Sequence, residues 1–199
     1  MFHKSTILVA LVVVPLCYAV VRLLPQPGPL WTSGLLHWGF ALLVLRVSKT
    51  AESPDIGLRH RRSRFLVFVV LIAGYCCGLN WLFDSQTLAE WQRAQMPFGR
   101  WGVVVTAMTA GFCEEIIFRG YMMTGLKHAG LPAWLAMILS SLSFVYFHGA
   151  PPVPLAVAFF VLTMIWAAIY HQTSVLWVTI YIHAFWDATV LLMPFESTP

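Results

Sequence analysis

Seven long apolar segments, separated by short polar ones, constrain this chain more than any other feature. Each runs for about 16 to 26 residues, against the roughly 20 that an α-helix needs to cross the hydrocarbon core of a bilayer. Backbone amides and carbonyls inside a membrane must be hydrogen-bonded within the protein, so these segments should be helices. The predicted spans are residues 6–24, 30–46, 65–83, 101–126, 133–148, 155–170 and 173–193.

The overall composition supports the same class. Of the 199 residues, 59% are hydrophobic and only 10% are charged, and the mean hydropathy is +0.77. A soluble domain would carry about 25% charged residues. We therefore expect an all-α, polytopic integral membrane protein with about seven transmembrane helices. No linker is long enough to divide the chain, so we predict one domain over residues 1–199, with N-terminal spans and loops in 1–99 and a core in 100–190.

The distribution of basic residues predicts the orientation in the membrane. Six arginines and lysines lie in the loop that joins the second and third spans, over residues 46–64. Such loops collect on the cytoplasmic side, which also places the N-terminus in the cytoplasm. We expect a cell membrane of bacterial type, that is, an inner membrane. The run RHRRSR at residues 59–64 is short and has no aromatic residues interleaved with it, so a nucleic-acid partner is not expected.

Three charges interrupt one of the most apolar stretches, GFCEEIIFRG at residues 111–120. Glu115 and Arg119 are four residues apart, so on a helix they share a face and are predicted to form an ion pair. Glu114 is rotated by about 100° from Glu115 and lacks that partner. One carboxylate would then be structural and its neighbour chemically available, as a base whose apolar setting suits it to work near neutral pH.

Other polar groups fall at a similar depth in the later spans: His148, His183 and Asp187. Counted from the cytoplasmic ends of their helices, Glu114 lies about 20 Å deep, His148 about 24 Å, and His183 and Asp187 about 15 to 21 Å. A lone membrane histidine is more often a helix-packing residue than a catalyst, and an Arg–Glu pair alone can simply fix packing. Ionisable groups inside a membrane are costly, so their coincidence at one level favours a functional site.

These residues also form three motifs in order: EEIIFR (114–119) fits E-E-x-x-x-R, FVYFH (144–148) fits F-x-x-x-H, and HAFWD (183–187) fits H-x-x-x-N/D. In this respect the chain resembles the CPBP intramembrane proteases, which include the CAAX prenyl endopeptidases and the bacteriocin-processing or immunity-related Abi group. The resemblance covers about residues 100–190. It implies a helical membrane peptidase that is described as glutamic-type or as a metalloprotease, and that acts on a membrane-embedded or membrane-anchored protein or peptide.

The resemblance also implies a role for each matched residue. Glu114 would activate water, with Glu115 and Arg119 in supporting positions. His148 would help to hold the water, and His183 with Asp187 would stabilise the oxyanion. Many members have Asn where this chain has Asp187, and an ionised Asp cannot donate a hydrogen bond. Asp187 would therefore be protonated, orient the His183 tautomer, or ligate a metal.

Cofactor use and alternative functions stay open at this stage. Glu114, His148 and His183 offer two imidazoles and a carboxylate, a set compatible with catalytic zinc, although no H-E-x-x-H pattern occurs. We expect no cofactor, with zinc as the alternative. A small proton- or cation-coupled transporter, or a non-catalytic scaffold or immunity protein of the same fold, would also use a buried charged set. Prenylated proteins, peptide pheromones or bacteriocins, and protein-sorting tails are all candidate substrates.

Overall fold

The computed structural model describes residues 38–46, 55–58, 99–148 and 152–192, and all regular structure within them is helical. The elements are a helix over residues 38–46, α5 (Gly99–Glu115), the π-helix η2 (Ile116–Met123), α6 (Thr124–His128), α7 (Ala133–Phe147), α8 (Val153–Thr173) and α9 (Leu176–Leu192). The spans predicted at 6–24 and 65–83, and the basic run at 59–64, lie outside the described residues.

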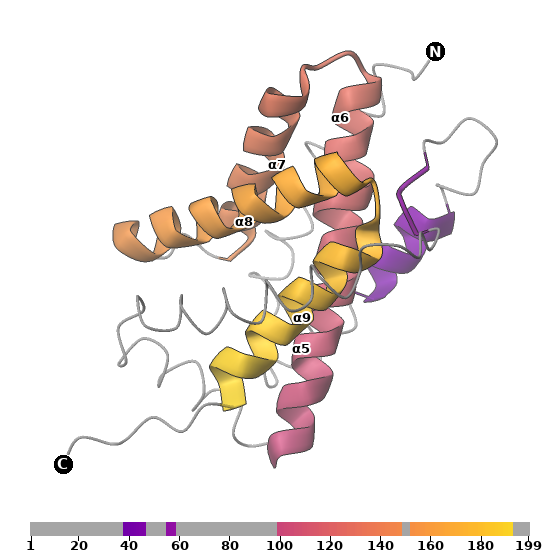
Figure 1. Ribbon diagram of the computed structural model, residues 1–199. Helices are drawn as coiled ribbons and strands as arrows, with labels where there is room; N and C mark the ends of the chain where they lie inside the picture. Colours follow the sequence, from indigo (N-terminus) through magenta and orange to yellow (C-terminus); the bar gives the residue numbers. More distant parts are fainter. Residues whose placement is uncertain (1–37, 47–54, 59–98, 149–151, 193–199) are drawn as a thin grey trace.

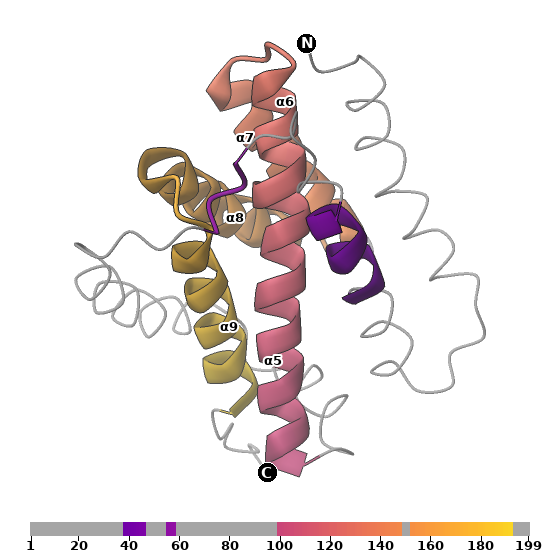
Figure 2. The ribbon, with the colours of Figure 1, turned by 90° about the vertical axis from the view of Figure 1, so that its right-hand side faces the viewer.

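Helices α5, η2 and α6 form one continuous column, which corresponds to the span predicted at 101–126 (Figure 2). Two helical segments are long and apolar enough to cross a membrane, judged by length and composition: Trp101–His128, with 28 residues and a hydropathy of 1.4, and Val153–Thr173, with 21 residues and a hydropathy of 2.2. The helix Ala133–Phe147 is apolar but shorter. The regular structure of the described residues is thus all helical, and their composition is typical of a membrane protein.

Turn residues set the ends of these helices. Gly130 adopts a φ of 96° in the turn after α6, and Pro132 then caps the start of α7. Pro152 precedes α8, and Pro154 lies in its first turn, where its missing amide hydrogen is not needed. Helix α8 ends at Ser174, which takes the left-handed conformation with a φ of 53°. The prolines at the predicted helix boundaries therefore act as helix starts here.

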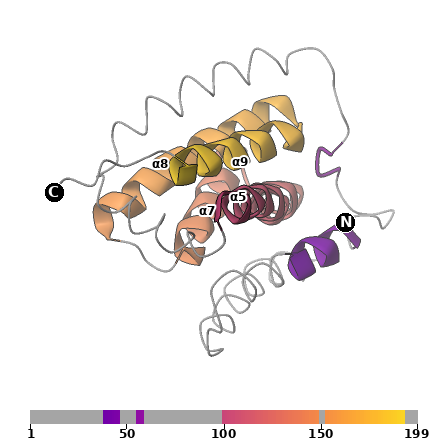
Figure 3. The same cartoon turned by 90° about the horizontal axis from the view of Figure 1, so that it is seen from below.

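Helix α9 packs along α5, α7 runs beside the upper part of the column, and α8 crosses the column rather than following it (Figures 1 and 2). Seen from below, α8 and α9 form a layer over α5 and α7 (Figure 3). The apolar core lies where η2 meets these helices, and its fully buried side chains include Ile116, Phe118, Met122, Leu176 and Ile180.

One close approach between α5 and α9, at Gly111 and Ala184, brings the carboxylates of α5 near α9. A Cβ added at Gly111 would lie 2.6 Å from the backbone nitrogen of Ala184, so the two helix backbones approach closely at this point. Small residues permit such close approach between membrane helices. Gly111 precedes Glu114 by one helical turn, and Ala184 follows His183 directly. The crossing therefore brings the acidic pair of α5 against the histidine of α9.

Candidate active site

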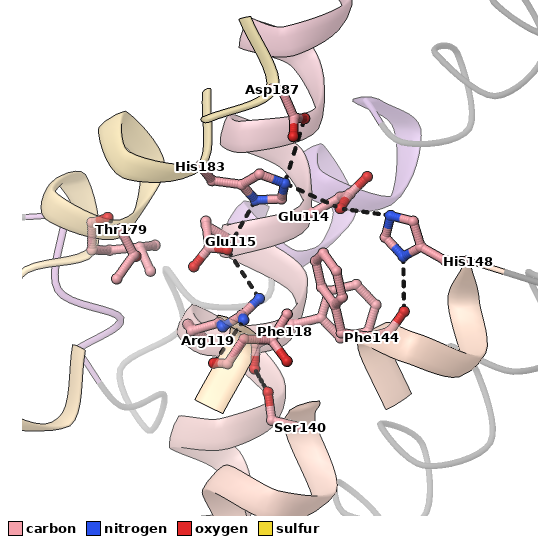
Figure 4. A network of polar contacts seen from close by, with 12 residues as sticks. Glu114, Glu115, Phe118, Arg119, Ser140, Phe144, His148, Thr179, His183 and Asp187 are labelled. Atoms are coloured by element: carbon pink, nitrogen blue, oxygen red, sulfur yellow. Dashed lines mark hydrogen bonds and ion pairs between the residues drawn. The ribbon is translucent and has the colours of Figure 1, made fainter. Parts of the chain in front are cut away.

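The six residues predicted from the sequence come from four elements and meet in one connected network (Figure 4). Helix α5 provides the two carboxylates at its C-terminal end, η2 the guanidinium, the end of α7 one histidine, and α9 the remaining pair. They are Glu114, Glu115, Arg119, His148, His183 and Asp187. From the sequence, only the Glu115–Arg119 ion pair and a common depth of the six residues were predicted, whereas the structure joins each of them to at least one other.

Glu115 links two of its neighbours through a single oxygen. Its Oε1 accepts a hydrogen bond from Arg119 Nη1 at 2.9 Å and lies 3.0 Å from Nδ1 of His183. The predicted Glu115–Arg119 ion pair is thus present, and both side chains are fully buried. Because a carboxylate oxygen only accepts hydrogen bonds, Nδ1 of His183 carries the hydrogen in this contact. Glu115 therefore orients the imidazole as well as neutralising the arginine.

Glu114 lies on the other side of the same imidazole. Its Oε2 is 3.7 Å from Nε2 of His183 and 4.0 Å from Nε2 of His148. Both separations exceed a direct hydrogen bond. Asp187 approaches the same edge of the His183 ring, with Oδ2 3.5 Å from Nε2. Three carboxylates consequently face one imidazole, Glu115 at Nδ1 and the other two at Nε2.

His148 is held by the end of its own helix. Its Nδ1 donates to the carbonyl oxygen of Phe144 at 2.9 Å, and its ring stacks on that of Phe144 with a centroid distance of 4.5 Å. The ring of Phe159 lies 5.3 Å away on another side. Since Nδ1 is used by a carbonyl, the neutral ring presents the lone pair of Nε2 toward Glu114.

Exposure divides the network into a closed and an open half. The side chains of Glu115 and Arg119 are 0% exposed, whereas those of His148 and Asp187 are 19% and 22% exposed. Glu114, at 6%, lies between the two halves. A molecule approaching from outside would therefore reach His148 and Asp187 first, with the buried Oε2 of Glu114 behind them.

One family model matches the part of the chain that contains these residues. Residues 96–189 match the model of the Rce1-like type II CAAX prenyl endopeptidases. The chain carries an Rce1-like CAAX-protease domain. This agrees with the resemblance read from the three motifs. No curated protein and no solved structure matches the chain. The CAAX-protease domain includes all six network residues, and its family is that of membrane endopeptidases.

The family match and the two apolar helices suggest an integral membrane protein, and the family suggests a membrane-associated protein as substrate. The matched segment begins just before α5 and ends within α9, so it contains the complete described column, α7, α8 and most of α9. The N-terminal orientation predicted from basic residues and the bacterial inner membrane stay predictions.

The zinc ligand set was tested on the geometry of the CAAX-protease domain. Two ligands of a tetrahedral zinc ion, each about 2.1 Å from the metal, lie about 3.4 Å from each other. The candidate donors Glu114 Oε2, His148 Nε2 and His183 Nε2 are separated by 3.7 and 4.0 Å along the two carboxylate–imidazole edges. Among the described residues, no group of three or more His, Cys, Asp or Glu side chains is arranged to hold a metal ion. These donors are therefore spaced somewhat more widely than the ligands of a bound zinc ion, and the use of zinc stays a prediction to be tested.

Sequence reasoning missed the residues that support the CAAX-protease site from outside its motifs. Arg119 Nη2 donates to the carbonyl oxygen of Thr163 on α8 at 3.1 Å, and the guanidinium lies over the ring of Trp166 at 5.5 Å. On α7, Ser140 Oγ donates to the carbonyl oxygen of Phe118 at 2.8 Å (Figure 4). These residues belong to none of the three motifs. Their contacts with the site become visible only in the folded arrangement of the helices.

The π-helix was also missed. It begins directly after Glu115 and contains Arg119. Thr124 Oγ1 donates to the carbonyl oxygen of Arg119 at 3.1 Å and pairs with the hydroxyl of Tyr170 at 3.0 Å. The Thr124 hydroxyl thus contacts a backbone carbonyl of the π-helix. π-Helical segments are frequent at functional sites, and this one follows the acidic pair directly and contains its arginine.

Proposed function

We propose that the domain hydrolyses a peptide bond of a membrane-associated protein, with Glu114 as the base that activates water. The supporting observation is the position of Glu114, whose carboxylate oxygen lies 3.7 and 4.0 Å from the Nε2 atoms of two histidines, between the closed and the open half of the network. Polar atoms at such separations suit a shared bridging water. The buried Glu115–Arg119 pair occupies the closed half, which leaves Glu114 as the chemically available carboxylate.

The proposed reaction begins when a water molecule attacks the carbonyl carbon of the scissile bond. Glu114 takes a proton from the water as the new C–O bond forms, and later delivers that proton to the leaving nitrogen as the C–N bond breaks. The lone pair of His148 Nε2 accepts the second hydrogen of the water. The developing oxyanion requires a donor. Either the Nε2–H of a doubly protonated His183 or the O–H of a protonated Asp187 supplies it.

The family name makes a C-terminal CAAX peptide with a prenylated cysteine the first substrate to test. The purified protein in proteoliposomes is given a quenched-fluorescent farnesylated peptide or the same peptide without the prenyl group. We expect cleavage by the wild type and a fall of about 10²- to 10⁴-fold in kcat for Glu114→Gln, the range for loss of a general base. Asp55→Asn is the matched acid-to-amide control, since Asp55 accepts its hydrogen bond from Gly57 outside the site.

Unchanged cleavage by correctly folded Glu114→Gln would refute the proposed base. If the wild type cleaves neither peptide, the same variant serves as a trap: it is crosslinked in its native membrane, and captured peptides are identified by mass spectrometry. Proton or cation flux through wild-type liposomes that disappears in Glu114→Gln, without any peptide cleavage, would favour a transporter over a protease.

A further inference from the structure

Helix α8 carries none of the three motifs, yet one of its faces contacts three motif residues. The ring of Phe159 lies 5.3 Å from that of His148, the carbonyl oxygen of Thr163 accepts from Arg119, and the ring of Trp166 lies 4.5 Å from that of His183. Positions 159, 163 and 166 are spaced by four and three residues, so they share one face of the helix. This face therefore forms a wall of the site.

Of these three α8 residues, Trp166 is the one that contacts two members of the network. It is 2% exposed, and its ring is inclined by 35° to the imidazole of His183 at a centroid distance of 4.5 Å. The guanidinium carbon of Arg119 lies 5.5 Å from the indole and 5.0 Å from the ring of Phe144, which meets the indole edge-on at 6.3 Å. The indole thus contacts both groups that bind Oε1 of Glu115.

These contacts restrict the motion of the imidazole. The hydrogen bond to Glu115 fixes Nδ1 of His183, but one bond alone leaves the ring free to pivot about it. The ring of Trp166 packs against the imidazole at a centroid distance of 4.5 Å, and the ring of Phe144 lies 5.6 Å from it. Since side chains hold a functional geometry only when their own rotamers are locked by packing, the indole keeps Nε2 directed toward Glu114.

Simple core filling accounts less well for this tryptophan. Its Nε1 is buried and has no hydrogen-bond partner among the described residues. A buried donor without a partner is unfavourable, and phenylalanine or leucine would fill apolar space without that donor. A large indole is therefore better explained by what its faces touch, namely an arginine and a histidine of the site.

We propose that Trp166 is a positioning residue of the peptidase site, which holds the His183 imidazole and the Arg119 guanidinium on the shared oxygen of Glu115. The inference rests on the proposed function. Trp166 acts through His183 and does not touch the reacting atoms. Its loss should thus lower kcat and leave KM nearly unchanged, because a small misplacement of a catalytic group costs up to about 10²-fold.

The test compares Trp166→Phe and Trp166→Ala with the same changes at Trp177. The indole of Trp177 donates to the carbonyl of Leu58 and packs near Phe112, away from the network. On the farnesylated peptide we expect kcat to fall about tenfold to 10²-fold in Trp166→Ala and less in Trp166→Phe, which retains an aromatic face. The variants at Trp177 should keep kcat within about twofold of the wild type, since only misplacement of a catalytic group is expected to lower it strongly.

Two further readouts separate positioning from general packing. Added indole should restore activity to Trp166→Ala but not change Trp177→Ala, because an apolar cavity of this kind binds a small aromatic molecule. Nitrogen NMR of labelled histidine, assigned with His183→Gln, should show a protonated Nδ1 at His183 in the wild type. In Trp166→Ala this signal should move toward the average of the two tautomers and return with indole.

Several results would overturn the inference. It fails if folded Trp166→Ala keeps wild-type kcat with an unchanged His183 spectrum, or if Trp177→Ala lowers kcat equally. If Trp166→Ala does not fold, the His183 spectrum and the kcat of Trp166→Phe test the inference instead. Wild-type values for both would contradict it. If the wild type cleaves no peptide, the proposed function is in question, while the His183 spectrum still decides the role of Trp166.

Discussion

The crossing of α5 and α9 should be intolerant of a single added methyl group at Gly111. In Gly111→Ala the new Cβ would lie 2.6 Å from the backbone nitrogen of Ala184, and 2.7 and 2.9 Å from its Cβ and Cα. An ordinary van der Waals contact begins at 3.4 Å. The two backbones would therefore have to separate by about 0.8 Å, a strain typical of overpacked cores.

That separation acts directly on the network, because His183 precedes Ala184. The distance from His183 Nδ1 to Glu115 Oε1 is 3.0 Å, and a displacement of about 0.8 Å along this line would take it beyond hydrogen-bond range. We expect a loss of about 10²-fold in kcat from the misplacement, and about 1–3 kcal/mol in the free energy of unfolding from overpacking.

Initial rates on the farnesylated peptide and thermal unfolding in detergent measure the two effects. Gly125→Ala is the matched control, since nothing lies within 4 Å of a Cβ at that position, and replacing an unconstrained helical glycine stabilises by up to about 1 kcal/mol. Adding Ala184→Gly to Gly111→Ala should not restore activity, because the closest atom is backbone nitrogen. Equal kcat and equal unfolding temperature in Gly111→Ala and Gly125→Ala would refute the reasoning. Full recovery of activity when Ala184→Gly is added to Gly111→Ala would also refute it.

Three further predictions concern other parts of the molecule. Arg119→Lys should lower kcat by about tenfold or more, because an ammonium group lacks the fork with which Arg119 contacts Glu115 and α8 together; a wild-type rate would contradict this. Gly57→Val should destabilise the protein by about 1–3 kcal/mol in thermal unfolding, since Gly57 has a φ of 77° and its Cβ would meet a carbonyl of the α8–α9 turn at 2.6 Å; an unchanged unfolding temperature would argue against docking of this segment. Elemental analysis of active protein should find no stoichiometric zinc, whereas zinc that is lost in His148→Ala and His183→Ala would establish a metal site.

The sequence predicted the helices of the described part well, because the length of an apolar segment is a local property of the chain. The spans expected at 101–126, 133–148, 155–170 and 173–193 correspond to α5 through α9 with ends shifted by a few residues. The ion pair of Glu115 and Arg119 was also predictable, since two residues four apart on a helix are neighbours whatever surrounds them. The π-helical turn between them did not disturb this pairing.

Contacts between helices were beyond the reach of such local rules. Matched depth indicated that the polar residues lie at one level, but not that Glu115 would bind His183 as well as Arg119. Nor does a hydropathy pattern specify that α8 crosses the column, because the tilt and rotation of an apolar helix are set by its packing against neighbours. Trp166, Ser140 and the carbonyl of Thr163 became recognisable only once that crossing placed them beside the motifs.

The two adjacent glutamates therefore differ through tertiary structure, although they are identical in chemistry. Glu115 turns toward the closed half, where Arg119 and Nδ1 of His183 both bind its Oε1. Glu114 turns toward the open half, and His183 lies between the two carboxylates with one ring nitrogen facing each. An imidazole held by a structural carboxylate on one side can present a defined nitrogen to the reactive carboxylate on the other. The same ring thus links the part of the network that stabilises the helices to the part proposed to perform the hydrolysis.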